Sequence, residues 1–188
     1  KKQADAVLRE EQAGFRSGRS CTDQIFTLRR ILEQALEHKT PLIINFIDFE
    51  KAFDSLDRES LWKILAVYGI PPKYIRVISN LCEDSECCVK VENDCTHLFK
   101  ILTGVKQGCV LSPVLFGLAM DWLMRQTIGV AARGLKWTRT QETFQDLDFA
   151  DDIALLSVSA EDTQLKTGKT IDLKISEKED TADGTLYD

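Results

Sequence analysis

Residues 147–156 read LDFADDIALL, and this stretch decides the fold because two acidic residues interrupt two short apolar runs. Each run is long enough for a β-strand, so Asp151 and Asp152 are predicted to lie at the tip of a β-hairpin. Another apolar segment, residues 42–49, reads LIINFIDF and predicts a strand buried on both faces that ends near Asp48. The sequence therefore places carboxylates at the ends of two predicted strands.

Helix and turn patterns occupy the rest of the chain. Apolar residues recur at helical spacing in segments that begin at capping or proline residues, the first of them capped by Thr22 or Asp23. Segments of β-type residues flank polar turns, which indicates hairpins. The order is typical of an α+β fold with helices on a mostly antiparallel sheet. We predict helices at about 22–40, 57–68, 72–81, 112–128 and 160–167, and further strands at 86–92, 97–102, 134–138, 142–149 and 153–158.

The composition is that of a globular domain. The chain has 188 residues, of which 44% are hydrophobic, with only 4 Pro and 10 Gly, and this argues against a disordered or low-complexity protein. Its apolar runs are far shorter than the roughly 18 residues that a membrane span needs, and the N-terminus lacks the apolar segment of a secretory signal. We therefore expect no membrane contact, a nuclear or cytoplasmic location rather than secretion, and reduced cysteines.

The charge of the chain is −6, and acidic residues outnumber basic ones most strongly after residue 145. A negative net charge argues against a general nucleic-acid binder, which is normally basic. The acidic residues near the C-terminal end are consistent either with a solvated tail or with a cation site.

Asp48, Asp151 and Asp152 are the strongest candidates for chemistry. An ionised carboxylate at the end of an apolar strand is costly unless it is paired or binds a metal. Neighbouring strands lie about 4.8 Å apart, so side chains at their ends can converge. Carboxylates suit Mg²⁺, and two such ions can activate a hydroxyl and stabilise a leaving pyrophosphate. The alternative is that these residues only form turns, as Asp commonly does at strand ends.

Four sequence blocks narrow this choice because they resemble, in the same order, blocks of the reverse transcriptases of non-LTR (LINE-type) retrotransposons. Residues 47–57, IDFEKAFDSLD, resemble motif A, and residues 104–113, GVKQGCVLSP, resemble motif B. Residues 149–152, FADD, resemble motif C. Residues 12–20, QAGFRSGRS, resemble the block of the fingers subdomain that precedes motif A.

The resemblance implies a metal site and a metal cofactor. Asp48 would be the motif A ligand, and the backbone carbonyl of Phe49 would add an oxygen. Asp151 would be the second carboxylate that bridges the metals, with Asp152 as a looser ligand. The implied cofactor is a pair of Mg²⁺ ions, with Mn²⁺ able to substitute.

The resemblance also implies contacts to substrates. Phe53 would be the aromatic gate that excludes a ribose 2′-hydroxyl, although a core aromatic is the alternative. Gln107 and Gly108 would lie beneath the templating base and the incoming nucleotide. Arg16 and Arg19 would contact template or triphosphate oxygens from the fingers, and solvated loop arginines are the alternative for both.

The implied architecture is a polymerase palm, an antiparallel sheet with helices packed on one face, plus part of the fingers. Residues 1–40 would be partial fingers, 41–158 the palm with motifs A, B and C, and 159–188 an altered motif D and tail. In that last region Asp172 stands where family members carry Gly, and Glu179 stands where they carry Lys. The chain therefore looks like a fragment without thumb or endonuclease.

The implied function is RNA-directed DNA polymerase activity, the transfer of dNTPs onto a primer 3′-hydroxyl. The partners would be an RNA template, a DNA primer and dNTPs, and the sequence leaves protein partners open. One alternative is a catalytically inactive remnant of a retroelement or an interaction domain. Another is a related reverse transcriptase, such as a group II intron maturase or telomerase, although the motif A and motif B strings fit LINE-type enzymes better.

Overall fold

The computed structural model describes residues 5–91, 94–128, 134–137 and 142–179, and it describes side chains as far as residue 170. Asn93 of the predicted hairpin turn and the tail from residue 180 lie outside the described residues. None of the helices within these ranges combines the length and the hydrophobicity that a membrane-spanning segment requires.

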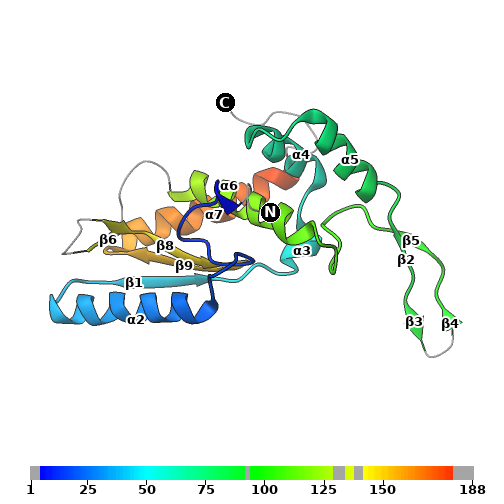
Figure 1. Ribbon diagram of the computed structural model, residues 1–188. Coiled ribbons are helices and arrows are strands. Elements are labelled where there is room, and N and C mark those ends of the chain that lie inside the picture. The colour runs from blue at the N-terminus through cyan, green and yellow to red at the C-terminus, as the bar shows by residue number, and fades with distance from the viewer. Residues whose placement is uncertain (1–4, 92–93, 129–133, 138–141, 180–188) are drawn as a thin grey trace.

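A three-stranded antiparallel sheet lies at the centre of the fold (Figure 1). Its strand order is β1-β9-β8, with β1 at Ile43–Ile47, β9 at Asp152–Ser157 and β8 at Asp146–Phe149. Because Ile47 pairs with Ile153, the C-terminal end of β1 lies beside the turn that joins β8 to β9. The predicted α+β class with an antiparallel sheet is confirmed.

β1 differs from the prediction in its burial. Among the described strands it lies at an edge and pairs only with β9, and Phe46 on it is 69% exposed. The expectation that residues 42–49 form a strand buried on both faces is therefore wrong. A continuous apolar run is typical of a central strand, but the run does not reveal whether a second neighbour covers its other edge.

Two helices pack on one face of the sheet. α6 (Ser112–Ile128) packs against α7 (Ala160–Glu179), and α7 also contacts β1 and β9. Phe116 of α6 shares a buried cluster with Ile153 and Leu155, which are alternate residues of β9. Because side chains alternate between the two faces of a strand, these positions define the α6 face of the sheet.

In addition to this predicted layer, α2 (Cys21–Glu37) covers the opposite face. Ile31 of α2 is fully buried with Ala154 and Leu156, the β9 residues that alternate with those facing α6. The sheet is therefore the middle layer of three, as Figure 1 shows.

The start of α2 corrects the predicted cap. Ser20, rather than Thr22 or Asp23, is the N-cap residue. Its hydroxyl accepts the backbone N–H of Asp23, and the Asp23 carboxylate accepts the N–H of Ser20 at 2.8 Å. This reciprocal capping box satisfies two backbone donors that a helix start leaves unpaired.

Three helices follow β1 in the chain. α3 (Ala52–Ser55) is a single short turn that the sequence did not indicate, and α4 (Arg58–Val67) and α5 (Pro72–Cys82) follow it. The Asp57 carboxylate accepts the N–H of Ser60 at 2.7 Å and caps α4. Pro72 opens α5, where a missing N–H carries no penalty. The predicted starts of α4 and α5 are thus confirmed.

A hairpin arm follows α5 and projects away from the rest of the molecule (Figure 1). Its strands are short and exposed, and their pairing confirms the predicted hairpin: β2 (Glu86–Cys87) pairs with β5 (Phe99–Lys100), and β3 (Lys90–Val91) pairs with β4 (Asp94–Cys95).

The last elements combine a small hairpin with a long helix. β6 (Leu135–Lys136) pairs with β7 (Thr143–Phe144) just before β8. α7 runs to Glu179, so the expectation of a short helix over residues 160–167 is wrong. Its polar sequence hides the period that indicates a long helix. The side chains of residues 171–179, which include the altered motif D positions, lie outside the description.

Candidate active site

The three predicted carboxylates lie at the same end of the central sheet. Asp48 directly follows the last residue of β1. Asp151 lies in the two-residue turn between β8 and β9, and Asp152 begins β9. Asp48 and Asp152 are exposed and Asp151 is half-buried. The predicted hairpin tip is confirmed, and strand pairing brings residues far apart in sequence to one edge.

The chemistry of these carboxylates fits a divalent cation. In the described part of the chain, the side chains of Asp48, Asp151 and Asp152 are in no ion pair or hydrogen bond, so their oxygens are available. Such oxygens are the ligands that Mg²⁺ and Mn²⁺ prefer. Among the described residues, no three His, Cys, Asp or Glu side chains are gathered closely enough to hold an ion as they stand.

The N-terminal segment runs beside β8. Gln12 forms a parallel bridge with Asp148. The N–H of Ala13 donates to the Asp148 carbonyl at 2.9 Å, and the N–H of Asp148 donates to the Glu11 carbonyl at 3.1 Å. The block predicted to belong to the fingers is therefore bonded directly to the hairpin that carries Asp151.

The Gln12 side chain makes hydrogen bonds to the hairpin turn itself. Its Nε2 donates to the carbonyl of Ala150 at 3.1 Å, and its Oε1 accepts the N–H of Ala150 at 2.8 Å. The same oxygen accepts the N–H of Gly14 at 2.7 Å. Ala150 has φ of 61°, which is uncommon for a residue with a side chain, and it immediately precedes Asp151.

The position of Phe53 agrees in part with each of its two predicted roles, the aromatic gate and the core aromatic. Its ring stacks on Phe116 of α6 with centroids 4.4 Å apart, and it meets the edge of Phe15 at 5.8 Å. It is only half-buried, and it is the second residue of α3, which follows Asp48 after a short turn. Packing fixes the ring, while its exposed part remains accessible; its role as a gate stays a prediction.

The motif B loop forms a tight turn at the start of α6. The N–H of Cys109 donates to the carbonyl of Lys106 at 3.1 Å, and Gly108 inside this turn has φ of 82°. The hydroxyl of Ser112 also donates to the Lys106 carbonyl, at 2.6 Å. Gln107 and Gly108 are exposed at the tip of this turn, and a Cβ at Gly108 would meet nothing within 4 Å. A nucleotide could therefore approach the turn, and the predicted contact stays a prediction.

The backbones of motif A and motif B pack directly against each other. A Cβ added at Gly104 would lie 2.6 Å from the Cα of Asp54 and 2.6 Å from the carbonyl oxygen of Phe53. The N–H of Val105 donates to that carbonyl at 2.9 Å. Only glycine permits this approach, so Gly104 holds the motif B loop against the segment that follows Asp48.

The two predicted arginines make contacts within the protein. Arg16 donates to the Asp5 carboxylate at 2.7 Å and to the carbonyls of Arg9 and Gln12, and its side chain is 7% exposed. Arg19 pairs with Glu10 and is 39% exposed. Arg16 therefore holds the N-terminal loop in this arrangement. Contacts of both arginines with template or triphosphate stay predictions.

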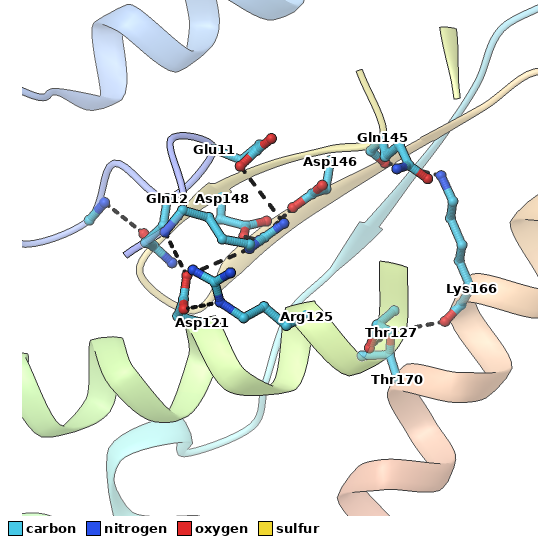
Figure 2. A network of polar contacts seen from close by, with 12 residues as sticks. Glu11, Gln12, Asp121, Arg125, Thr127, Gln145, Asp146, Asp148, Lys166 and Thr170 are labelled. Atoms are coloured by element: carbon cyan, nitrogen blue, oxygen red, sulfur yellow. Dashed lines mark hydrogen bonds and ion pairs between the residues drawn. The ribbon is translucent and has the colours of Figure 1, made fainter. Parts of the chain in front are cut away.

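A buried ionic network lies beneath the hairpin (Figure 2). Arg9 donates to Asp146 at 2.6 Å and to Asp148 at 2.5 Å, and both carboxylates are almost fully buried on alternate residues of β8. Burial and the charge of Asp146 raise the pKa of the Asp148 carboxyl well above its usual range, against the opposing effect of Arg9. The nearby carboxylates outweigh burial and raise the pKa of the Arg9 guanidinium.

Asp121 of α6 completes this network and is fully buried. Its carboxylate accepts the backbone N–H of Arg9 at 2.7 Å, the Nε of Arg125 at 2.7 Å and the hydroxyl of Tyr68. Burial and this bond raise the pKa of the Tyr68 hydroxyl, and the bond to Asp121 raises the pKa of Arg125. The network ties the N-terminal segment to both α6 and β8.

Sequence reasoning missed Arg9, Gln12 and Asp121. Asp121 carried a signal, because a carboxylate between apolar helix residues needs a partner when it is buried. Gln12 and Arg9 carried none, since their partners are more than a hundred residues away.

Over residues 1–178 the chain matches the reverse transcriptase (RNA-dependent DNA polymerase) family, and it belongs to that family. It is 30% identical over 161 residues to the Retrovirus-related Pol polyprotein from type-2 retrotransposable element R2DM of Drosophila melanogaster; the match covers 86% of this chain and 15% of that protein. It is 32% identical over 111 residues to the Probable RNA-directed DNA polymerase from transposon BS of the same organism, covering 58% of this chain and 12% of that protein. The resemblance to non-LTR retrotransposon reverse transcriptases is confirmed.

The fold is also similar to solved structures of telomerase. Apo telomerase from Candida tropicalis, truncated from its C-terminal domain, superposes with a TM-score of 0.60 at 22% identity, covering 93% of this chain and 35% of that chain. This likeness supports the palm and fingers architecture alone. Because the chain spans a small part of its relatives, it corresponds to one portion of the polymerase proteins it matches.

Proposed function

We propose that this chain performs RNA-templated DNA synthesis, in which a primer 3′-hydroxyl attacks the α-phosphate of a dNTP and pyrophosphate leaves. The observation that supports this proposal is the meeting of motifs A and C at one end of the sheet, with available carboxylates at Asp48, Asp151 and Asp152. Through Gly104 the motif B loop packs against the backbone of Phe53 and Asp54, which follow Asp48 in motif A. Family membership supports a templated polymerase and a divalent metal requirement.

The metal ligands would be the carboxylates of Asp48 and Asp151, with Asp152 held more loosely and the carbonyl of Phe49 as a further oxygen. Two Mg²⁺ ions, or Mn²⁺ in their place, would supply electrostatic stabilisation of charge on the attacking and leaving oxygens. The protein's own contribution is positioning. Asp48 directly follows β1, Asp151 lies in the tight turn between β8 and β9, and Asp152 begins β9, so the pairing of these strands limits the movement of all three residues.

The substrates would be an RNA template, a DNA primer and dNTPs. Phe53 is held by Phe116, and such a fixed ring can exclude a ribose 2′-hydroxyl. The exposed turn at Gln107 and Gly108 offers an amide for hydrogen bonding and a backbone that a nucleotide can approach closely. We place this activity in the nucleus or cytoplasm.

Primer extension on an RNA template with Mg²⁺ tests the proposal. We expect the parent chain to extend an annealed DNA primer and Asp151→Asn to show no extension above background. Asp54→Asn is the matched control, because Asp54 is an exposed carboxylate on neighbouring α3 and its replacement changes the charge equally. Absence of extension by the folded parent would favour an inactive remnant. The altered motif D also favours this alternative, as does the finding that, among the described residues, no three potential ligands lie close enough together to hold an ion.

A further inference from the structure

We infer that Gln12 is a positioning residue that fixes the Ala150-Asp151 turn and thereby the direction in which Asp151 presents its carboxylate. The inference rests on the proposed metal site and extends it to a residue outside motifs A, B and C. It assigns the N-terminal segment a role at the reaction centre through contact with the backbone of the hairpin.

The turn needs support because of its backbone conformation. Ala150 has φ of 61°, in the left-handed region, which is unfavourable for a residue with a side chain because its Cβ approaches the following carbonyl. Both polar backbone groups of Ala150 are bonded to the one carboxamide of Gln12. The surrounding structure therefore specifies a conformation that the residue would not favour on its own.

Only a side chain with both a donor and an acceptor can make this pair of bonds. Glutamine supplies both, whereas an ionised glutamate only accepts and methionine offers no strong donor or acceptor. The Oε1 of Gln12 also accepts the N–H of Gly14, so both of its acceptor positions are used. Gln12 is 2% exposed, which keeps water from competing for these bonds.

Gly14 makes the close approach possible. A Cβ at this position would lie 2.2 Å from the backbone nitrogen of Ala150. The backbone of Gly14 can therefore pass the turn closely enough for Gln12 to reach it.

Two further contacts hold the same segments together, away from the turn. The Nε2 of Gln24 donates to the carbonyls of Glu11 and Asp148 at 2.7 and 3.1 Å. Gln24 thus joins the N-terminal segment to β8 but does not contact Ala150. It is the matched control for a merely structural role, because its removal loosens the same interface.

The test compares Gln12→Met with Gln24→Met. Free Mn²⁺, measured by electron paramagnetic resonance during titration, reports the affinity of the chain for the metal. We expect Gln12→Met to bind Mn²⁺ about 10- to 100-fold more weakly, as is typical when a residue that orients a metal ligand is lost. We expect Gln24→Met to leave this affinity unchanged. Raising Mg²⁺ should restore primer extension in Gln12→Met and fail to restore it in Asp151→Asn.

Equal Mn²⁺ affinity in the two folded glutamine variants would overturn the inference. Should Gln12→Met not fold, Gln12→Glu replaces it, since it keeps the size and the accepting oxygens while removing the donor to Ala150. If the parent binds Mn²⁺ but makes no DNA, the polymerase proposal fails and the affinities still decide the role of Gln12.

If the parent binds no Mn²⁺, the metal proposal fails, and amide hydrogen exchange then tests whether Gln12 positions the turn. Faster exchange at residues 150–152 in Gln12→Met than in Gln24→Met would then support the positioning role, and equal exchange would overturn it.

Discussion

At the residue scale, Gly14 has no room for a side chain. Its added Cβ would overlap the Ala150 backbone, which belongs to a paired hairpin and cannot move freely. We expect Gly14→Ala to destabilise the fold by at least about 1–3 kcal/mol, the usual range for overpacking. The midpoint of urea unfolding measures this loss.

Gly168→Ala is the control, and its expected change in stability has the opposite sign to that of Gly14→Ala. Gly168 lies within α7 and a Cβ there meets nothing within 4 Å. Because alanine favours a helix interior over glycine by about 1 kcal/mol, this variant should be slightly more stable than the parent. Equal stability of the two variants would contradict the close approach at Gly14.

The residues that could be predicted are those whose role follows from local pattern. Asp151 and Asp152 could be placed at a hairpin tip because two β-type runs flank them. Gln12 could not be predicted as a contact of Ala150, because the contact depends on how distant segments pack. A buried glutamine in a polar, glycine-bearing stretch looks like a loop residue until its partner is known.

At the element scale, Arg58 joins three segments at the base of the hairpin arm. Its guanidinium donates to the carbonyls of Gly104, Cys82 and Ile101 at 2.7–3.0 Å. We expect Arg58→Met to lower the free energy of unfolding by about 2–3 kcal/mol, since hydrogen bonds from charged groups are strong. It should also accelerate amide exchange in residues 101–105, which lead into the motif B loop.

The control for this prediction is Arg76→Met. Arg76 is an exposed arginine of α5 whose side chain makes no hydrogen bond or ion pair among the described residues. Its replacement should leave both unfolding and exchange unchanged. If Arg58→Met behaved in the same way, the guanidinium would not be what anchors the arm.

The starts of α4 and α5 could be predicted from local sequence. Asp57 and Pro72 begin α4 and α5 where the sequence indicates, because capping and the special backbone of proline are local effects. The edge position of β1 could not be predicted, since it depends on which strands become neighbours. The length of α7 was missed because its polar sequence lacks a clear apolar period.

At the scale of the whole molecule, the buried network predicts a dependence of stability on pH. The folded state raises the pKa of Asp148, so folding favours its protonated form. The resulting stabilisation is fully present below the ordinary pKa of an aspartate and is lost as the pH rises through the raised value. Arg9, Asp146 and Glu11 are the charged groups that set this balance.

Asp148→Asn removes the titrating group while keeping a similar shape. We therefore expect the stability of this variant, relative to the parent, to increase as the pH rises. Urea unfolding at several pH values measures the difference. The exposed Asp84→Asn, which loses only a surface ion pair with Lys100, should show no such trend. A stability of Asp148→Asn relative to the parent that falls as the pH rises would contradict the raised pKa of Asp148.

The whole fold was predictable to the level of class and of the order of motifs, because the four sequence blocks mark the strand ends and loops of the polymerase architecture. The covering of the second sheet face by α2 was not, since an amphipathic helix does not reveal which face it covers. The network through Asp121 joins α6, β8 and the N-terminal segment, and only the assembled molecule shows it.

The most direct test of the central claim, that the carboxylates at the sheet end form a metal site, is thermal unfolding with and without millimolar Mn²⁺. An ion that binds only the folded chain stabilises it by about 2.7 kcal/mol at 100 times its Kd. For a domain of this size that corresponds to a rise in Tm of about 5–10 °C. We predict this rise for the parent and for Asp54→Asn, and its absence in Asp151→Asn. A cooperative melt with the same response to Mn²⁺ in Asp151→Asn as in the parent would contradict the claim.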